Sequence, residues 1–255
     1  MKNYGYKPDI ESPDDYKFGG FNFPEKILQE SGQWDDYLPI IENQNINFET
    51  NGCVSFATTS IIEILHKRRF ENEPNYSDRY VIVASETDPN SGNTPKKVAD
   101  TIRKTHGNIE EKLYPFTDTL EEFFKPLETG LVWQGKGWLK RYTFGYEKVS
   151  GHPQAIKEAL KSSPLGIAVY AWAEKDGLYY RPEGYPDVHY CVLYGYEDGK
   201  FWKVFDSYEG NLKKLAWDFG FSIVNRYYIE KKDFKESFLD KVSRGIKRYF
   251  SFIFS

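Results

Sequence analysis

The sequence predicts an α+β protein with two lobes, and three observations support this prediction. The chain has 255 residues, enough for one large domain or a two-lobed one. Its first half is mainly helical in its apolar spacing, whereas its second half contains apolar and aromatic runs with strand spacing. Because helices followed by antiparallel strands are typical of separate lobes, we expect a cleft between a helical lobe and a strand lobe.

Four helices are predicted, and the first of them begins at Cys53. From there, apolar residues at positions 57, 61, 64 and 65 form a helical stripe that ends near the basic cluster "HKRRF", where cations favour a helix C-terminus. Proline is common at the first helical position, and it begins two of the other three. These three helices are expected at about residues 76–86, 95–105 and 153–162.

Four strands are predicted in the second half of the chain, each rich in apolar and aromatic residues. They are expected at residues 165–174, 188–197, 200–208 and 221–230. No internal repeat or low-complexity segment interrupts them. The antiparallel lobe is therefore expected to contain all four.

An Asp-Gly pair joins the second and third predicted strands. Asp198 and Gly199 lie between alternating aromatic runs, which is a strong signal for a tight hairpin. If these two residues form the turn, Cys191 faces Asp206 across the hairpin. Asp206 then becomes the diagonal neighbour of His189, which lies on the same face as Cys191.

The two ends of the chain differ from the predicted domain at residues 31–230. Residues 1–30 are polar and rich in Gly and Pro, so we expect an extended arm over the surface. Residues 231–255 contain seven Lys/Arg and three Asp/Glu and predict a basic amphipathic helix. This helix is compatible with packing on its own body, docking a partner or lying on an anionic membrane.

Composition excludes several classes of function. A net charge of −4 provides no general surface for nucleic acid, and no apolar run approaches the ~20 residues that span a bilayer. The N-terminus has no apolar signal-peptide core, and two cysteines are too few for a disulfide framework. We therefore expect a cytoplasmic protein without a cofactor. We also expect no metal site, because Cys191 and His189 lack two further ligands at suitable spacing.

Cys53 is a candidate nucleophile because the first turn of a helix favours a thiolate. Such a cysteine needs a base, usually histidine. His66 is thirteen residues further along the same helix, roughly 20 Å away, and so cannot reach the thiol. His106 lies at a helix end, and His152 remains possible in a loop. His189 begins the strongly apolar strand "HYCVLYGY" and is the preferred base.

Two further side chains complete the candidate site. Asp206 can fix the tautomer of His189 and stabilise its charged form. The first N–H groups of the helix can stabilise an oxyanion, and Gln44, nine residues before Cys53, is the candidate side-chain donor beside them.

These segments resemble the papain/cathepsin family of cysteine peptidases. "ENQNINFETNGCVSFATTSIIE" resembles its Gln-Gly…Gly-Ser-Cys-Trp-Ala-Phe segment, and "VHYCVLYGYEDGKFWKVFDSYEG" resembles its His-Ala-Val…Val-Gly-Tyr…Lys-Asn-Ser-Trp-Gly segment. The order Cys, His, Asn/Asp matches, and the separation of 136 residues falls in the family's range of about 130–150. The resemblance runs from about residue 33 to 230, and the short arm is similar to the leader of bacterial and phage-like members.

The resemblance implies a papain-like fold and a cysteine peptidase that cuts extended peptide or protein substrates. Cys53 would be the nucleophile, His189 the base and Gln44 the oxyanion donor. Two substrate-side residues are implied as well: Gly92, whose backbone would pair with the substrate, and Tyr208, in place of the Trp that shields the histidine's hydrogen bond. An apolar substrate side chain two residues before the cut is also implied.

Four departures from the family pattern bear on the site. Asp206 stands where the family usually has Asn, and the added charge should keep His189 protonated to a higher pH. The segment between Gln44 and Cys53 is three residues longer than in the family, and Val54 replaces the Trp that normally follows the nucleophile. The family's disulfide cysteines are missing, which suits a reducing compartment.

Three functions remain open at this point. The first is peptide-bond hydrolysis through an acyl-enzyme on Cys53. The second is a related Cys-His-Asp amide hydrolase with a narrow substrate, either leader-processing or cell-wall. The third is a catalytically silent papain-like module that binds peptides or has a structural role. Val54 and Tyr208, which stand where the family has Trp, favour the third, which predicts peptide binding without labelling of the thiol at neutral pH.

Overall fold

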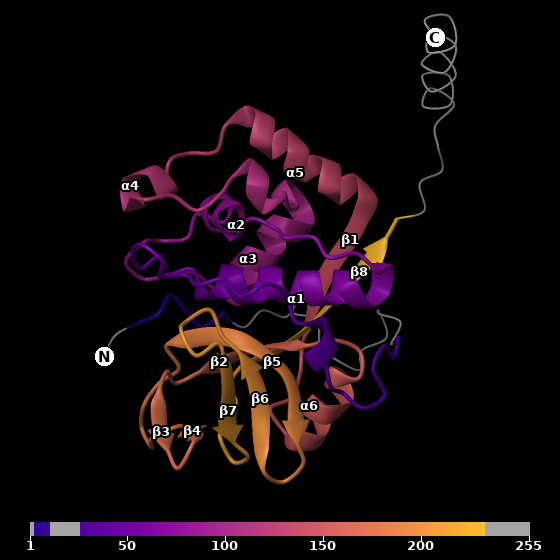
Figure 1. Cartoon of the computed structure of the whole chain (residues 1–255), viewed down its shortest axis with the longest axis vertical. Coiled ribbons are helices and arrows are strands. Elements are labelled where there is room, and N and C mark those ends of the chain that lie inside the picture. Colours follow the sequence, from indigo (N-terminus) through magenta and orange to yellow (C-terminus); the bar gives the residue numbers. More distant parts are fainter. Residues whose placement is uncertain (1–2, 11–25, 233–255) are drawn as a thin grey trace, which may run out of the picture.

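The computed structural model describes residues 3–10 and 26–232. The predicted helix over residues 231–255 lies outside the described residues except at its start, where Lys231 ends a strand. The described chain forms an upper helical lobe and a lower strand lobe (Figure 1). The predicted α+β class is confirmed.

The helical lobe is built around α1, with shorter helices packed on the side away from the sheet (Figure 1). A 3-10 helix, η1, precedes α1, and a π-helical turn, η2, and a second 3-10 helix, η3, lie between α3 and α4. The bounds are η1 Asp35–Tyr37, α1 Cys53–Phe70, α2 Asp78–Ala84, α3 Pro95–Thr101, η2 Ile102–His106, η3 Glu111–Leu113, α4 Leu120–Phe123 and α5 Thr129–Arg141.

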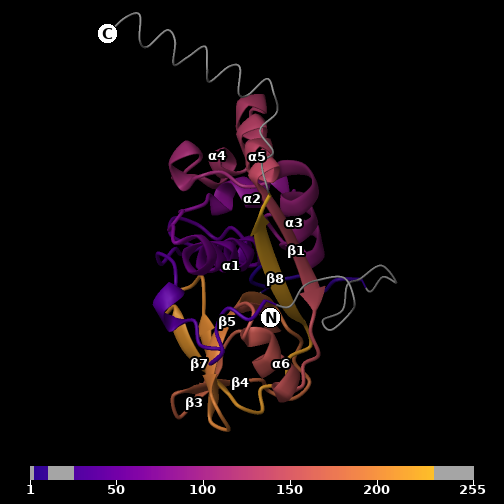
Figure 2. The same ribbon diagram turned by 90° about the vertical axis from the view of Figure 1, so that its right-hand side faces the viewer.

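The strand lobe contains one eight-stranded sheet and the helix α6, Pro153–Leu160. Its strands are β1 Tyr142–Lys148, β2 Leu165–Val169, β3 Ala173–Lys175, β4 Leu178–Tyr180, β5 His189–Glu197, β6 Phe201–Phe205, β7 Leu212–Ala216 and β8 Val224–Lys231. Their order is β1-β8-β2-β5-β6-β7-β4-β3, and the pairs are antiparallel except for a short parallel contact between β4 and β7. β1 and β8 run side by side up to the helical lobe (Figure 2).

Helix α1 is the central element because both of its sides are covered. It packs against β5, β8 and β2 on one side and against α2 and α3 on the other. Most of its side chains are therefore buried, including polar ones such as Thr58 and His66. This packing fixes the start of α1, at Cys53, against the start of β5.

The predicted helices are confirmed, with some differences at their ends. The helix expected at 95–105 is α3 continued by the π-helical η2, and Gly107 ends it with φ +67°. The sequence did not predict α5, because three glycines lower its helix propensity. Nor did it predict β1, which follows α5 without a loop. The strand expected at 165–174 is broken into β2 and β3.

The predicted hairpin has the right partners but the wrong turn. Its loop contains three residues, Asp198 to Lys200, rather than two, and Gly199 has φ +70°. A β-bulge between Leu193 and Gly195 offsets the extra residue. Beyond this bulge Val192 pairs with Phe205, which is the predicted register.

The close packing of α5 gives a paired test of the fold. A Cβ at Gly135 would lie 2.1 Å from the backbone oxygen of His106 and 2.2 Å from the Tyr80 hydroxyl. Gly135→Ala should therefore lower the free energy of unfolding by roughly 1–3 kcal/mol in urea denaturation. Gly137→Ala, on the same helix with open space around it, should raise the free energy of unfolding by up to about 1 kcal/mol. Equal effects at both positions would contradict this packing.

Candidate active site

The thiol of Cys53 lies at the first residue of α1, where the helix leaves N–H groups without intrahelical partners. The N-cap residue, Gly52, provides no side-chain cap. A Cβ there would lie 2.4 Å from Ile82 Cδ1, so the Ile82 side chain of α2 packs closely against the backbone of Gly52. The backbone N–H groups of Val54 and Tyr190 act on the buried sulfur as donors that lower the pKa of the thiol. The thiol therefore touches the beginning of β5.

His189 is the first residue of β5 and precedes Tyr190, whose N–H contacts the thiol. Its Nε2 is 2.5 Å from Asp206 Oδ1, and both side chains are fully buried. Its Nδ1 has no hydrogen-bond partner in the part of the chain that the structure describes. The structure thus brings together Cys53, His189 and Asp206 from α1, β5 and the end of β6.

Asp206 is held as a carboxylate by His189 and Lys213. Burial alone would raise its pKa, but the interaction and hydrogen bond with His189 and the charge of Lys213 lower the pKa below its usual value. Lys213 Nζ is 2.8 Å from Asp206 Oδ2. Sequence reasoning missed Lys213. The alternating pattern of β7, in which a lysine occupies an inward position, is the signal that could have found it.

Aromatic rings enclose the imidazole of His189. The ring centroids of Tyr208, Trp172 and Tyr4 lie 5.3, 5.7 and 5.8 Å from that of His189, all in edge-on contacts. Tyr208 therefore lies beside the imidazole, in the region expected for a shielding residue. Trp172 and Tyr4 were not predicted as neighbours of His189.

Gln44 is buried, and both its backbone and its side-chain oxygen are hydrogen-bonded to Ser207. Its backbone N–H donates to Ser207 O at 2.9 Å, and its Oε1 accepts from the Ser207 hydroxyl at 2.8 Å. Nε2 is thereby turned toward Tyr4 O, Tyr208 Oη and Glu49 Oε1, at 3.2, 2.8 and 2.8 Å. The structure leaves this donor group beside the same tyrosines that contact His189.

Glu49 is a second residue that sequence reasoning missed. Its Oε1 accepts from Gln44 Nε2, and its Oε2 accepts from the Tyr208 hydroxyl at 2.6 Å. Burial, together with this carboxylate, raises the pKa of Tyr208 and keeps its phenol protonated. Glu49 lies in the segment between Gln44 and Cys53, which is longer than in the papain/cathepsin family. This extra length was the signal that could have found it.

Residues 3–10, which we call the arm, lie between the lobes rather than over the surface as expected (Figure 1). Tyr4 N–H donates to Val188 O of the strand lobe at 2.9 Å. On the helical side, Asn93 N–H donates to Gly5 O at 2.9 Å, and Lys7 N–H donates to Asn93 O at 2.8 Å. These backbone bonds pair the arm in parallel with the chain at Asn93.

The arm fits tightly because Gly5 has no side chain. Gly5 has φ +104°, and a Cβ there would lie 2.0 Å from the backbone oxygen of Asn51. A Cβ at Gly92 would lie 1.8 Å from Gly5 O, so Gly92 gives the arm room while Asn93 makes the backbone bonds. Tyr6 is 4% exposed and stacks on Tyr190 at 6.0 Å.

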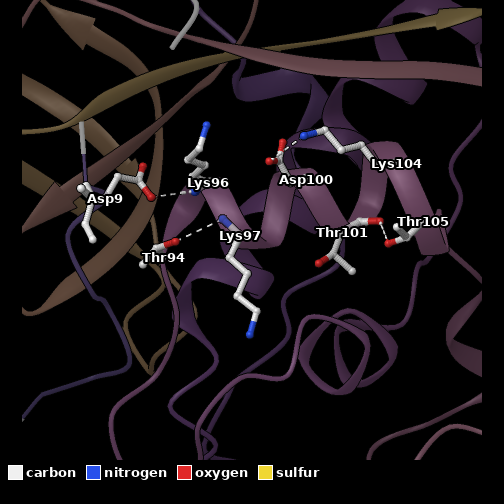
Figure 3. Close-up of a pocket in the computed structure, with 9 residues that line it drawn as sticks. Asp9, Thr94, Lys96, Lys97, Asp100, Thr101, Lys104 and Thr105 are labelled. Atoms are coloured by element: carbon white, nitrogen blue, oxygen red, sulfur yellow. Dashed lines mark hydrogen bonds and ion pairs between the residues drawn. The ribbon is translucent and has the colours of Figure 1, made fainter. Parts of the chain in front are cut away.

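Beyond Tyr6 the arm reaches the N-terminus of α3. Asp9 Oδ1 accepts from Lys96 N–H at 2.9 Å, as Figure 3 shows. An open depression there is lined by the lysines of α3 and by Asp100, which pairs with Lys104 (Figure 3). This depression contains none of the predicted site residues.

The arm and the enclosed site keep the thiol of Cys53 neutral. Burial raises its pKa well above the ordinary value, and the charges of Asp206 and Glu49 raise it further, against hydrogen bonds from the backbone of Tyr190 and Val54. Burial therefore opposes the lowering of the thiol pKa that is expected from the helix N-terminus. Cys191 is also free and buried.

The described residues contain neither a candidate metal site nor a helix that could span a membrane. Within residues 3–10 and 26–232, no three His, Cys, Asp or Glu side chains are grouped so that they could hold a metal ion. No helix in these same ranges has the length and apolar character needed to cross a bilayer.

Comparison with known proteins shows the fold. No family model matches the sequence, and no curated protein matches it. The bromelain protease of Ananas comosus, solved with the E64 inhibitor, is 19% identical, with a TM-score of 0.60 over 78% of this chain and 97% of that one. The proform of the ragweed pollen cysteine protease Amb a 11 is 14% identical, with a TM-score of 0.63 over 85% and 69%.

A third similar structure is the digestive procathepsin L 3 of the Tenebrio molitor larval midgut. It is 15% identical, with a TM-score of 0.57 over 86% of this chain and 69% of that one. These structural neighbours are cysteine proteases, and the chain has the papain-like fold that the sequence predicted.

Displacement of the arm should expose the thiol. In Gly5→Ala the new Cβ cannot fit beside Asn51, so the arm should leave and water should reach Cys53. Because each unit by which the thiol pKa falls makes the thiolate tenfold more abundant, alkylation of Cys53 by iodoacetamide at pH 7 should rise about tenfold or more. The rise with pH should also begin at a lower pH than in the wild type.

The control is Ile10→Ala, at an arm position that is 88% exposed. This variant should alkylate at the wild-type rate, with the modified cysteine identified by peptide mapping. If Gly5→Ala also reacted at the wild-type rate, the arm would not be what shields Cys53.

Proposed function

We propose that this chain is a papain-like cysteine peptidase that hydrolyses peptide bonds through Cys53, His189 and Asp206. One observation carries the proposal. The imidazole of His189 is held by Asp206 through Nε2, its Nδ1 has no partner among the described residues, and the adjacent Tyr190 N–H contacts the Cys53 thiol. Thiol catalysis requires a base that is fixed by an acid and whose second nitrogen is left without a partner. His189 meets this requirement, and the residue after it contacts the thiol.

In the proposed reaction His189 Nδ1 takes the proton from Cys53 as the sulfur attacks the peptide carbonyl. The resulting oxyanion would be stabilised by the first N–H groups of α1 and by Gln44 Nε2. His189 then gives its proton to the leaving amine, and the peptide bond breaks to leave a thioester on Cys53. Water, activated by His189, hydrolyses the thioester and restores the thiol.

The arm supports the proposed position of the substrate. It is an extended segment whose Tyr4 carbonyl accepts from Gln44 Nε2 and whose backbone bonds to Val188 and Asn93. A peptide substrate would take its place, with Asn93 and Val188 available for backbone bonds and Gly92 leaving room. The space that holds Tyr6 against Tyr190 would accept an apolar or aromatic substrate side chain.

A second candidate function is a catalytically silent papain-like module that binds extended peptides. The Glu49 carboxylate favours it, since a negative charge 2.8 Å from Gln44 Nε2 competes with an oxyanion for the same donor. This module would bind a peptide measurably but would show no reaction of its thiol at neutral pH.

Covalent labelling separates the two functions. In the Gly5→Ala background, an epoxysuccinyl thiol reagent should label Cys53, and cleavage of a peptide library should be detectable. Cys53→Ala should abolish the labelling and lower kcat/KM by about 10³-fold or more. Gln44→Ala should lower kcat by about 10²-fold because one oxyanion donor is lost.

Cys191→Ala is the matched control because Cys191 is the other buried free cysteine. Labelling should persist in this variant. Labelling that persists in Cys53→Ala, or that moves to Cys191, contradicts the assignment. Peptide binding without any labelling of Cys53 would favour the silent module.

A further inference from the structure

Lys213 is a buried cation in the candidate site. Its side chain is 4% exposed, although a lysine is almost never buried unless its charge is paired. It lies on β7, which pairs with β6, the strand that ends just before Asp206. Its two neighbours on β7, Leu212 and Lys214, are exposed, as the alternation of a strand requires.

The ammonium group of Lys213 is fully engaged by the loop that carries Asp206. Nζ is 2.8 Å from Asp206 Oδ2 and donates to the backbone oxygens of Gly210 and Glu209 at 2.8 and 3.2 Å. It also lies 5.4 Å from the ring of Trp172, which contacts His189. Lys213 thus contacts Oδ2 of the Asp206 carboxylate, while the imidazole of His189 contacts Oδ1.

We propose that Lys213 is a positioning residue, which orients the Asp206 carboxylate toward His189 and cancels its charge, so that the two side chains act together as a neutral hydrogen-bond acceptor. The proposal rests on the function proposed for Cys53 and His189. It modifies the expectation that Asp206 adds a net negative charge beside the histidine.

Charge balance supports this role. A carboxylate alone stabilises the protonated imidazole, and a cation 2.8 Å from the same carboxylate opposes that stabilisation. Other titratable groups also face Asp206 or His189. They are Cys53 of α1, Tyr179 of β4, Cys191 of β5, Tyr208 and Tyr4 of the arm. None of these five is a cation, whereas Lys213 forms an ion pair with Asp206.

The test follows the ring signals of His189 by NMR in the intact chain as the pH is varied. Loss of the signals in His189→Ala assigns them. In Lys213→Met, which keeps the length of the side chain but removes the charge, His189 should become neutral about 1 pH unit higher than in the wild type. In Asp206→Asn it should become neutral at a lower pH than in the wild type.

The double variant Asp206→Asn/Lys213→Met removes both charges together. Its titration should lie close to the wild type, because the sum of the two charges is unchanged. The matched control is Lys214→Met, which removes the same charge from the exposed face of the same strand. It should titrate like the wild type.

Each outcome bears on the proposal. If Lys213→Met titrates like Lys214→Met, or if the double variant shifts as far as a single one, Lys213 does not act through Asp206 and the proposal is overturned. If Lys213→Met fails to fold, the double variant decides, since a folded protein with the wild-type titration supports the pair. Absence of labelling at Cys53 would sink the peptidase proposal but leave this measurement valid.

Discussion

The packing of α1 against β5 is the contact on which the rest of the site depends. It places the first turn of the helix beside the first residues of the strand, so that the thiol of Cys53 meets the backbone of Tyr190. Neither lobe contains a site by itself. The helix contributes sulfur and N–H groups, while the sheet contributes the imidazole of His189 and the acid that holds it.

Around this contact the chain balances charges that would otherwise be costly to bury. The Asp206 carboxylate lies between His189 and Lys213, and the Glu49 carboxylate receives hydrogen bonds from Gln44 and Tyr208. A buried charge is tolerated when it is paired and hydrogen-bonded, and both carboxylates meet that condition. The thiol of Cys53 differs from these carboxylates because it is neutral. Burial and the charges of the two acids raise its pKa and so oppose its ionisation.

Much of this arrangement could be predicted from the sequence because its signals are local. The Asp-Gly turn alone predicted that Asp206 approaches His189, and a bulge absorbed the one-residue error in the loop. The contacts of Glu49 and Lys213 could not be predicted, although the longer segment before Cys53 and the alternation of β7 single out these two residues. Their contacts depend on how segments distant in sequence meet in three dimensions. The position of the arm was missed for the same reason. In the sequence Gly5 looks like an ordinary loop glycine, and the structure shows that the backbone of Asn51 lies against it.

The sharing of β8 between the lobes has a mechanical consequence. This strand pairs with β2 in the lower sheet and with β1 beneath α5, and it also packs against α1. Separation of the lobes would break the backbone pairing of this strand. We therefore expect the arm to leave by losing its own backbone bonds to Val188 and Asn93 while the two lobes stay joined.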